Sequence, residues 1–223
     1  DSLLVRGQHA AAEEAFTAAL ALTPLGDRLA QAGRHGKVAA TLQARLLVAE
    51  AEAASERALT ALGDPAADWP PAWQRAWLEL QLARMEILYT KNDLDALARL
   101  VAAIEPAVAA AVSPAYRADF ATGLLHLALR REQFTLSAKT VAAAEAHLAA
   151  AQETGDPARL AWGWFGLGFA RLWAGQLGAA AAPLLTGLQL AQELGLAHTE
   201  VVCLTYLSCT YRFLGDAVEA RRY

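Results

Sequence analysis

Residues 160–180 of this chain read LAWGWFGLGFARLWAGQLGAA, and the stretch predicts two helices that pack closely against each other. Trp164 is large enough to fill the space between paired helices, and Gly168 lets a second helix approach because it has no side chain. Gly175 can take the positive φ that ends a helix. Ala180 falls where the returning helix crosses the first, so a small residue is needed there. The stretch therefore predicts a helix–turn–helix unit.

Turn residues recur along the chain at a nearly constant interval. The predicted turns are at Gly7, Glu50, Asn92, Gln133, Gly175 and Gly215, which gives a period of 40 to 43 residues. Glu50 is the weakest of these positions because it carries no turn-forming residue. The two helices around it are either fused into one or shifted in register. A repeat at a fixed period of this size is typical of a helical-repeat protein.

Clusters of Gly, Pro and polar residues separate the apolar runs and predict the joints between repeats. The joints are expected at residues 23–27, 63–71, 106–114, 155–157 and 195–199. Asp68, Ser113 and Asp156 precede prolines at or near a first helical position, which is a signal for the start of a helix. We expect helices at residues 8–22, 28–48, 51–62, 70–90, 93–111, 114–131, 136–154, 157–174, 177–194, 198–214 and 216–223.

The chain is 56% hydrophobic, with Ala and Leu dominating and few β-branched runs, so the predicted fold class is all-α. The helix–turn–helix spacing resembles the tetratricopeptide (TPR) repeat. The residues that carry this resemblance are Trp164, Leu167, Gly168, Gly175 and Ala180, and in the first half-repeat Gly7, Ala12, Phe16, Ala19 and Pro24. A standard TPR has a period of about 34 residues, so each helix here should be about one turn longer.

The resemblance implies a right-handed superhelical solenoid of about five TPR-like repeats. Residues 1–223 would form a single repeat domain, truncated at both ends from a larger protein. Residues 131–195 and 203–221 are similar to the long-repeat TPR sensor regions of MalT-like activators in the LuxR group and of related signalling ATPases. That similarity implies a non-enzymatic sensor region of a cytoplasmic bacterial regulator. A free-standing scaffold that binds a peptide segment of a partner protein is the alternative.

Several other classes of protein are not supported by the composition. The net charge is −4 and no basic stripe is present, so we expect no direct contact with nucleic acid. No apolar run predicts a transmembrane helix. Cys203 and Cys209 are six residues apart on one predicted helix and point in different directions, so they should not pair. Few cysteines and no disulfide framework fit a cytoplasmic protein.

We expect neither catalysis nor a cofactor or metal ion. The glycine-rich runs at residues 163–168 and 33–37 lack the strand and the Lys-Ser or Lys-Thr of a phosphate-binding loop. The histidines fall in different repeats and have no partner at metal-ligand spacing. No carboxylate pair suggests acid–base chemistry.

Gly187 lies in mid-helix, where alanine would gain about 1 kcal/mol in helix propensity if space permits.

An aromatic stripe is the best candidate for a binding site. Trp162, Phe165, Phe169 and Trp173 cover one face about 100° wide, while Trp164 lies on the opposite packing face. In the same register, neighbouring helices add further aromatic and arginine residues. The complete predicted groove consists of Trp162, Phe165, Phe169, Trp173, Tyr206, Arg212, Phe213, Arg130 and Arg131. The groove would hold a protein or peptide segment, or a small-molecule effector. The alternative is that these side chains form the core between repeats.

Overall fold

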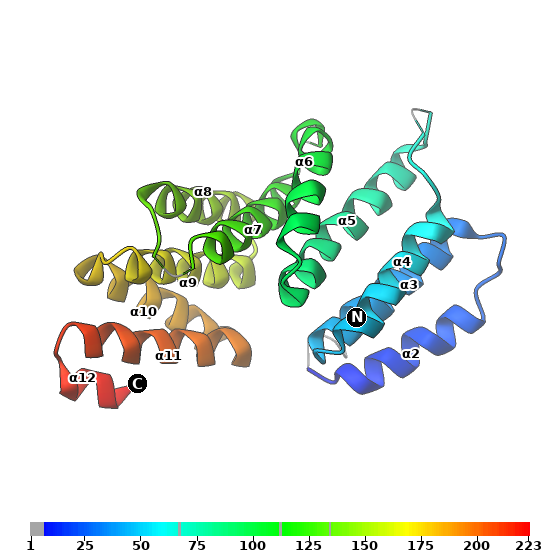
Figure 1. The fold of residues 1–223 in the computed structure, drawn as a ribbon. Helices are drawn as coiled ribbons and strands as arrows, with labels where there is room; N and C mark the ends of the chain where they lie inside the picture. Colours follow the sequence, from blue (N-terminus) through cyan, green and yellow to red (C-terminus); the bar gives the residue numbers. More distant parts are fainter. Residues whose placement is uncertain (1–6, 67, 112, 134) are drawn as a thin grey trace. The chain divides into compact units, whose positions relative to one another are not determined.

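The computed structural model describes residues 7–66, 68–111, 113–133 and 135–223, and over these ranges the chain forms helices and no strand (Figure 1). The helices are α2 (His9–Ala21), α3 (Arg28–Ala44), α4 (Val48–Leu62), α5 (Pro71–Lys91), α6 (Leu94–Ala110), α7 (Pro114–Arg131), α8 (Ala138–Thr154), α9 (Pro157–Trp173), α10 (Leu177–Leu194), α11 (Ala197–Phe213) and α12 (Ala217–Arg222). The all-α class is confirmed for the described residues. The superhelical handedness and the number of repeats stay predictions.

Residues with a positive φ occupy the predicted turns. They are Gly7 (70°), Asn92 (61°), Gln133 (47°), Gly175 (73°) and Gly215 (78°). Glu50 is the exception, because it lies inside α4 and the turn is at Leu46, whose φ is 60°. After Leu46, the N–H of Leu47 donates to the carbonyl of Leu42 at 3.0 Å. The same hydrogen bond to a carbonyl five residues earlier closes the turns at residues 92, 175 and 215, so the helix end imposes this geometry even on leucine.

The predicted helix starts are correct to different degrees. Asp156 caps α9, and its side chain accepts hydrogen bonds from the N–H groups of Ala158 at 2.9 Å and Arg159 at 3.4 Å. Ser113 precedes α7 without a side-chain cap, and Asp68 is not a cap because α5 begins at Pro71. The joint predicted from residue 106 begins later, since α6 continues through that position to Ala110.

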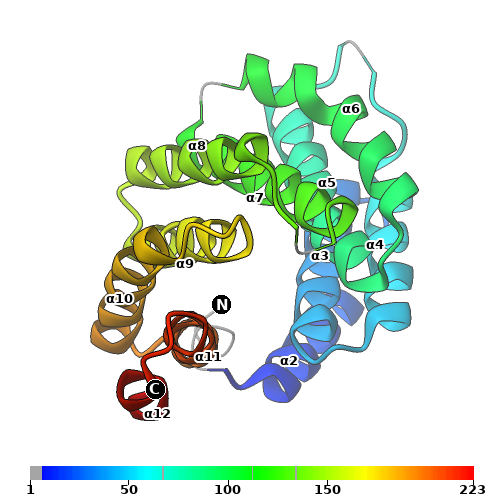
Figure 2. The same cartoon turned by 60° about the vertical axis from the view of Figure 1, so that its left-hand side comes forward.

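The chain divides into two compact units, Asp1–Ala107 and Val108–Tyr223. In the first unit α3 packs on α2, α4 on α3, and α5 on both α4 and α3. In the second unit helices α7 to α12 pack one on the next in chain order, and α9 also contacts α11 (Figure 2). Neighbour-on-neighbour packing of this kind is the arrangement of an α-solenoid.

Tryptophan side chains stabilise the joint between α4 and α5 in the first unit. Trp69, Trp73 and Trp77 pack against a buried cluster that includes Leu62 and Leu80. The rings of Trp69 and Trp73 meet edge to face, with their centroids 5.6 Å apart. Such edge-to-face pairs add stability beyond the area they bury. The packing of these tryptophans thus stabilises the long connection between α4 and α5.

Candidate functional site

The predicted groove residues begin on α9, which packs against α8, α10 and α11. Gly168 lies at the closest approach of α9 and α10, as the sequence predicts. A Cβ atom at Gly168 would lie 2.5 Å from Cγ and 3.0 Å from the backbone nitrogen of Leu184. Leu184 is fully buried. The missing side chain of Gly168 therefore makes the space that the Leu184 side chain fills.

Gly187 of α10 is a second close approach, and here the sequence interpretation needs correction. A Cβ atom there would lie 3.1 Å from the carbonyl oxygen of Ala161 and 3.2 Å from the backbone nitrogen of Phe165. Those neighbours are backbone atoms of α9 and cannot rotate away. The gain in helix propensity expected for alanine is thus opposed by crowding between the two helices.

Six aromatic side chains of α9 and α11 form a continuous chain of ring contacts, which we call the aromatic row. Its members are Trp162, Phe165, Phe169, Trp173, Tyr206 and Phe213. The ring centroids of Phe169 and Tyr206 are 4.6 Å apart, and those of Trp173 and Phe213 are 6.2 Å apart. The register predicted from the sequence thus brings residues of α9 next to their expected partners on α11.

The middle of the aromatic row is core and its end is accessible. Phe165 and Phe169 are 8% and 7% exposed and share a buried cluster with residues of α10 and α11. Trp162, Trp173 and Tyr206 pack against that cluster but are half-buried. Phe213, in the last turn of α11, is 55% exposed. The most exposed member of the row is therefore Phe213, which contacts half-buried Trp173 at this end.

The arginines of the predicted groove lie near helix C-termini. Arg130 and Arg131 are in the last turn of α7, and the preceding residue, Leu129, packs against the cluster that contains Phe165. The end of α7 therefore adjoins the aromatic row. Arg131 is exposed and Arg130 half-buried, while Arg212 is exposed in the last turn of α11 beside Phe213. Aromatic and cationic side chains thus occur together at this end of the second unit.

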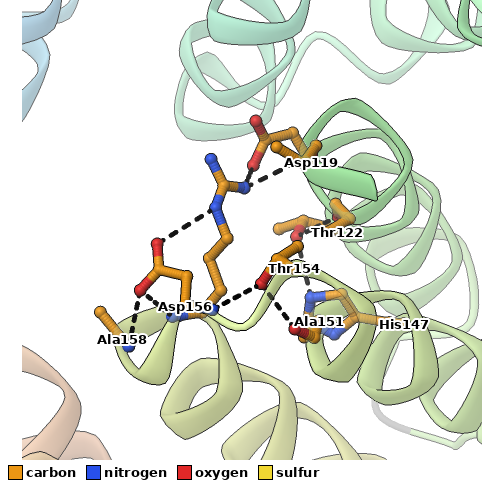
Figure 3. A network of polar contacts seen from close by, with 10 residues as sticks. Asp119, Thr122, His147, Ala151, Thr154, Asp156 and Ala158 are labelled. Atoms are coloured by element: carbon orange, nitrogen blue, oxygen red, sulfur yellow. Dashed lines mark hydrogen bonds and ion pairs between the residues drawn. The ribbon is translucent and has the colours of Figure 1, made fainter. Parts of the chain in front are cut away.

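A polar network between α7, α8 and α9 was not predicted from the sequence. Arg159 in the first turn of α9 forms an ion pair with Asp119 of α7 and a second one with Asp156, with Nε–Oδ2 at 3.4 Å (Figure 3). Partial burial lowers the pKa of Arg159. Its half-exposed position makes this network a modest contributor to stability. The helix-start role of Asp156 is the one part that the sequence indicated.

A buried histidine pair lies within the same helices. His126 of α7 and His147 of α8 are on one antiparallel pair, which corrects the expectation that the histidines lie in separate repeats. His147 Nε2 is 2.9 Å from the hydroxyl of Thr122, which itself donates to the carbonyl of Ala118 (Figure 3). When the single proton of the Thr122 hydroxyl is directed to Ala118, Nε2 is the nitrogen that donates to this hydroxyl, and Nδ1 is then unprotonated in the neutral ring. Burial, and then the charge of His126, lower the pKa of His147 to about 4.

The cysteines show no sign of special reactivity. Both are free, as the sequence predicts. Cys203 is fully buried between α10 and α11, and this burial raises the pKa of its thiol to about 12. A thiol of this kind stays protonated at neutral pH and behaves as a small apolar side chain. Among the residues that the structure describes, no group of three or more His, Cys, Asp and Glu side chains is placed to hold a metal ion.

The described residues define an all-helical array in which successive helices pack in order, with an aromatic row on α9 and α11. No model of a known protein family matches the chain, and no curated protein matches it in sequence. Within the described ranges, none of the helices is both long and apolar enough to cross a membrane.

Proposed function

We propose that this chain is a non-enzymatic, TPR-like binding module. The support for a repeat architecture is the series of left-handed turn residues at nearly regular intervals, together with the packing of each helix on its neighbour within each unit. Arrays of this kind stack helix pairs and use the exposed side chains of successive helices to bind extended ligands.

The binding site is the accessible end of the aromatic row, with Trp173 and Phe213 as its apolar part. The observation that supports this site is the continuous ring contact that runs from buried Phe169 through half-buried Trp173 to exposed Phe213. Rings whose positions are fixed by contacts with a packed core lose little conformational entropy when a ligand covers them. Arg212 and Arg131 nearby would bind a carboxylate, because guanidinium groups are always charged and bind it in bidentate fashion.

The ligand class follows from this chemistry. It is a segment of a partner protein with an apolar or aromatic side chain next to an acidic one, or a small effector with the same two features. In the biological setting that the resemblance suggests, the chain is the sensor region of a cytoplasmic transcriptional regulator or signalling ATPase. A free-standing adaptor is the second candidate. The neighbouring coding sequence separates the two, since the sensor requires a nucleotide-binding domain and a DNA-binding helix–turn–helix in the same protein.

A peptide-display experiment tests the site. Random peptides selected on the whole chain should be enriched in aromatic and acidic residues, and calorimetry should show that Trp173→Ala and Phe213→Ala each weaken their binding by about 2 kcal/mol. Val201→Ala is the matched control, because Val201 is 60% exposed on α11 and lies outside the aromatic row. If the selected peptides bind all three folded variants as tightly as the wild type, the site is wrong.

A further inference from the structure

A pocket in the first unit collects positive charge in an otherwise acidic protein. It lies between α3 and α4 and has a volume of about 310 Å³. Its lining consists of Leu25, Arg28, Gln31, His35, Arg57, Thr60 and Ala61. We call it the basic pocket. Among the lining residues that the structure describes, none is a carboxylate, although the whole chain has a net charge of −4.

Arg28 is held in place by its neighbours. Its Nε donates to the carbonyl of Ala61 at 2.9 Å and its Nη2 to the carbonyl of Leu62 at 2.8 Å, at the C-terminal end of α4. Its guanidinium group also lies over the ring of Trp73, 5.3 Å from the centroid. Among the described residues, the hydrogen bonds of Arg28 use Nε and Nη2, so the donors of Nη1 can serve a ligand. A guanidinium that is fixed before a ligand arrives loses little entropy on binding it.

Arg57 of α4 and His35 of α3 both line this pocket. After burial, the positive charge of Arg57 is the second cause that lowers the pKa of His35. The Arg57 side chain is exposed on α4, and the exposed Thr60 one turn later adds a hydroxyl to the lining. Two guanidinium groups, an imidazole and a hydroxyl therefore converge from two helices. This set of donors suits an anion with several oxygen atoms.

We propose that the basic pocket binds the phosphate group of a small phosphate monoester. A phosphate offers more acceptor oxygens than a carboxylate and can accept hydrogen bonds from Arg28, Arg57 and Thr60 at the same time. The volume is at the lower end of the range for small-molecule sites, about 300–1,000 Å³, so an organic group is accommodated as well as the anion. Leu25, which is 90% exposed, and Ala61 provide the apolar contact for that group. The aromatic row has no part in this site.

The test uses the whole chain, with phenyl phosphate, inorganic phosphate and benzoate as probes at constant ionic strength. Calorimetry should give the tightest binding for phenyl phosphate. In the wild type, phenyl phosphate should raise the pKa of His35, followed by NMR, by roughly one unit because a bound dianion stabilises the imidazolium. A His35→Gln variant identifies the resonance. Equal binding of inorganic phosphate would overturn the ester assignment, and equal binding of benzoate would overturn the phosphate assignment.

Arg57→Gln and Arg75→Gln form the matched pair of variants. Both remove one exposed arginine from the first unit, but Arg75 is on α5 and is not in the pocket lining. Arg57→Gln should weaken phenyl phosphate binding roughly tenfold or more, while Arg75→Gln should leave it unchanged. Equal weakening in both variants would show that the anion responds to general charge, and this result would also overturn the proposal.

Discussion

The α3–α4 pair of the first unit and the α9–α10 pair of the second unit achieve close helix packing with different side chains. Along α3 and α4, buried alanines such as Ala32, Ala51 and Ala54 allow the helices to approach. Between α9 and α10, Gly168 has no side chain and Leu184 fills the space in front of it. The buried alanines already hold a Cβ atom at the contact, whereas at Gly168 even a Cβ atom would overlap Leu184. The second arrangement should therefore be the more sensitive to substitution.

The turns of the two helix pairs also differ, because the residue with a positive φ is a glycine in one and a leucine in the other. Gly175 joins α9 to α10 with a φ of 73°, which glycine adopts without cost. Leu46 joins α3 to α4 with a φ of 60° although it has a side chain that is 73% exposed. The left-handed conformation costs a residue with a Cβ atom about 1 kcal/mol or more. The α3–α4 turn is thus strained at a position where the α9–α10 turn is not.

Substitution of Gly168 should change the free energy of unfolding more than any other substitution that tests this comparison. In Gly168→Leu the new side chain would overlap Leu184, which is fully buried, so unfolding free energy should fall by about 3 kcal/mol or more. Gly187→Ala adds one methyl group and should cost less. Urea denaturation of both variants measures the difference. Gly33→Ala of α3 is the control, because nothing lies within 4 Å of the added Cβ and helix propensity should stabilise it by up to about 1 kcal/mol. A leucine variant as stable as the wild type would disprove the close approach.

Acid should affect the second unit through His147. The pKa of His147 is lowered from 6.5 to about 4, so the unfolded chain binds a proton at this residue in a pH range where the folded chain does not. Stability should therefore fall as the pH falls from 6.5 to 4, by about 3 kcal/mol, and then become level. The lowered pKa of Glu132 acts in the same direction but only below about pH 4.5, whereas the lowered pKa of His35 in the first unit acts in the upper part of the range together with that of His147.

His147→Gln isolates this contribution. Glutamine keeps an N–H group for the Thr122 hydroxyl but does not titrate. The free energy of unfolding, measured in urea between pH 7 and 4, should therefore depend less on pH in the variant than in the wild type. Parallel curves for the two proteins would show that His147 is not the titrating group.

Leu46→Gly should give the smallest effect and the opposite sign. Glycine removes the strain of the positive φ, and the exposed leucine side chain loses little packing, so stability should rise by about 0.5–1 kcal/mol. Leu22→Gly is the matched control, because Leu22 is 86% exposed after α2 but has a φ of −90°. Thermal denaturation should show a higher midpoint for Leu46→Gly and a lower one for Leu22→Gly. A lower midpoint for both would mean that the turn at Leu46 is not strained.

Local chemistry explains which features could be predicted. Gly175 and Asn92 indicate turns because their own backbone preferences suit a positive φ. Leu46 has no such preference, and its conformation follows from the hydrogen bond between Leu47 and Leu42 that closes the helix end. The turn was therefore expected at Glu50 from the 40- to 43-residue period alone, four residues too late.

The sequence by itself determined the helices, most of their ends and the shared face of the aromatic residues on α9, because all of these depend on the 3.6-residue helical period and on residue preferences. Tertiary structure decided that Phe165 and Phe169 are core while Phe213 is exposed, since this depends on how closely α10 and α11 approach α9. It also brought together the two buried histidines and the lining of the basic pocket. Their members are far apart along the chain and meet through helix packing, which leaves no local signal in the sequence.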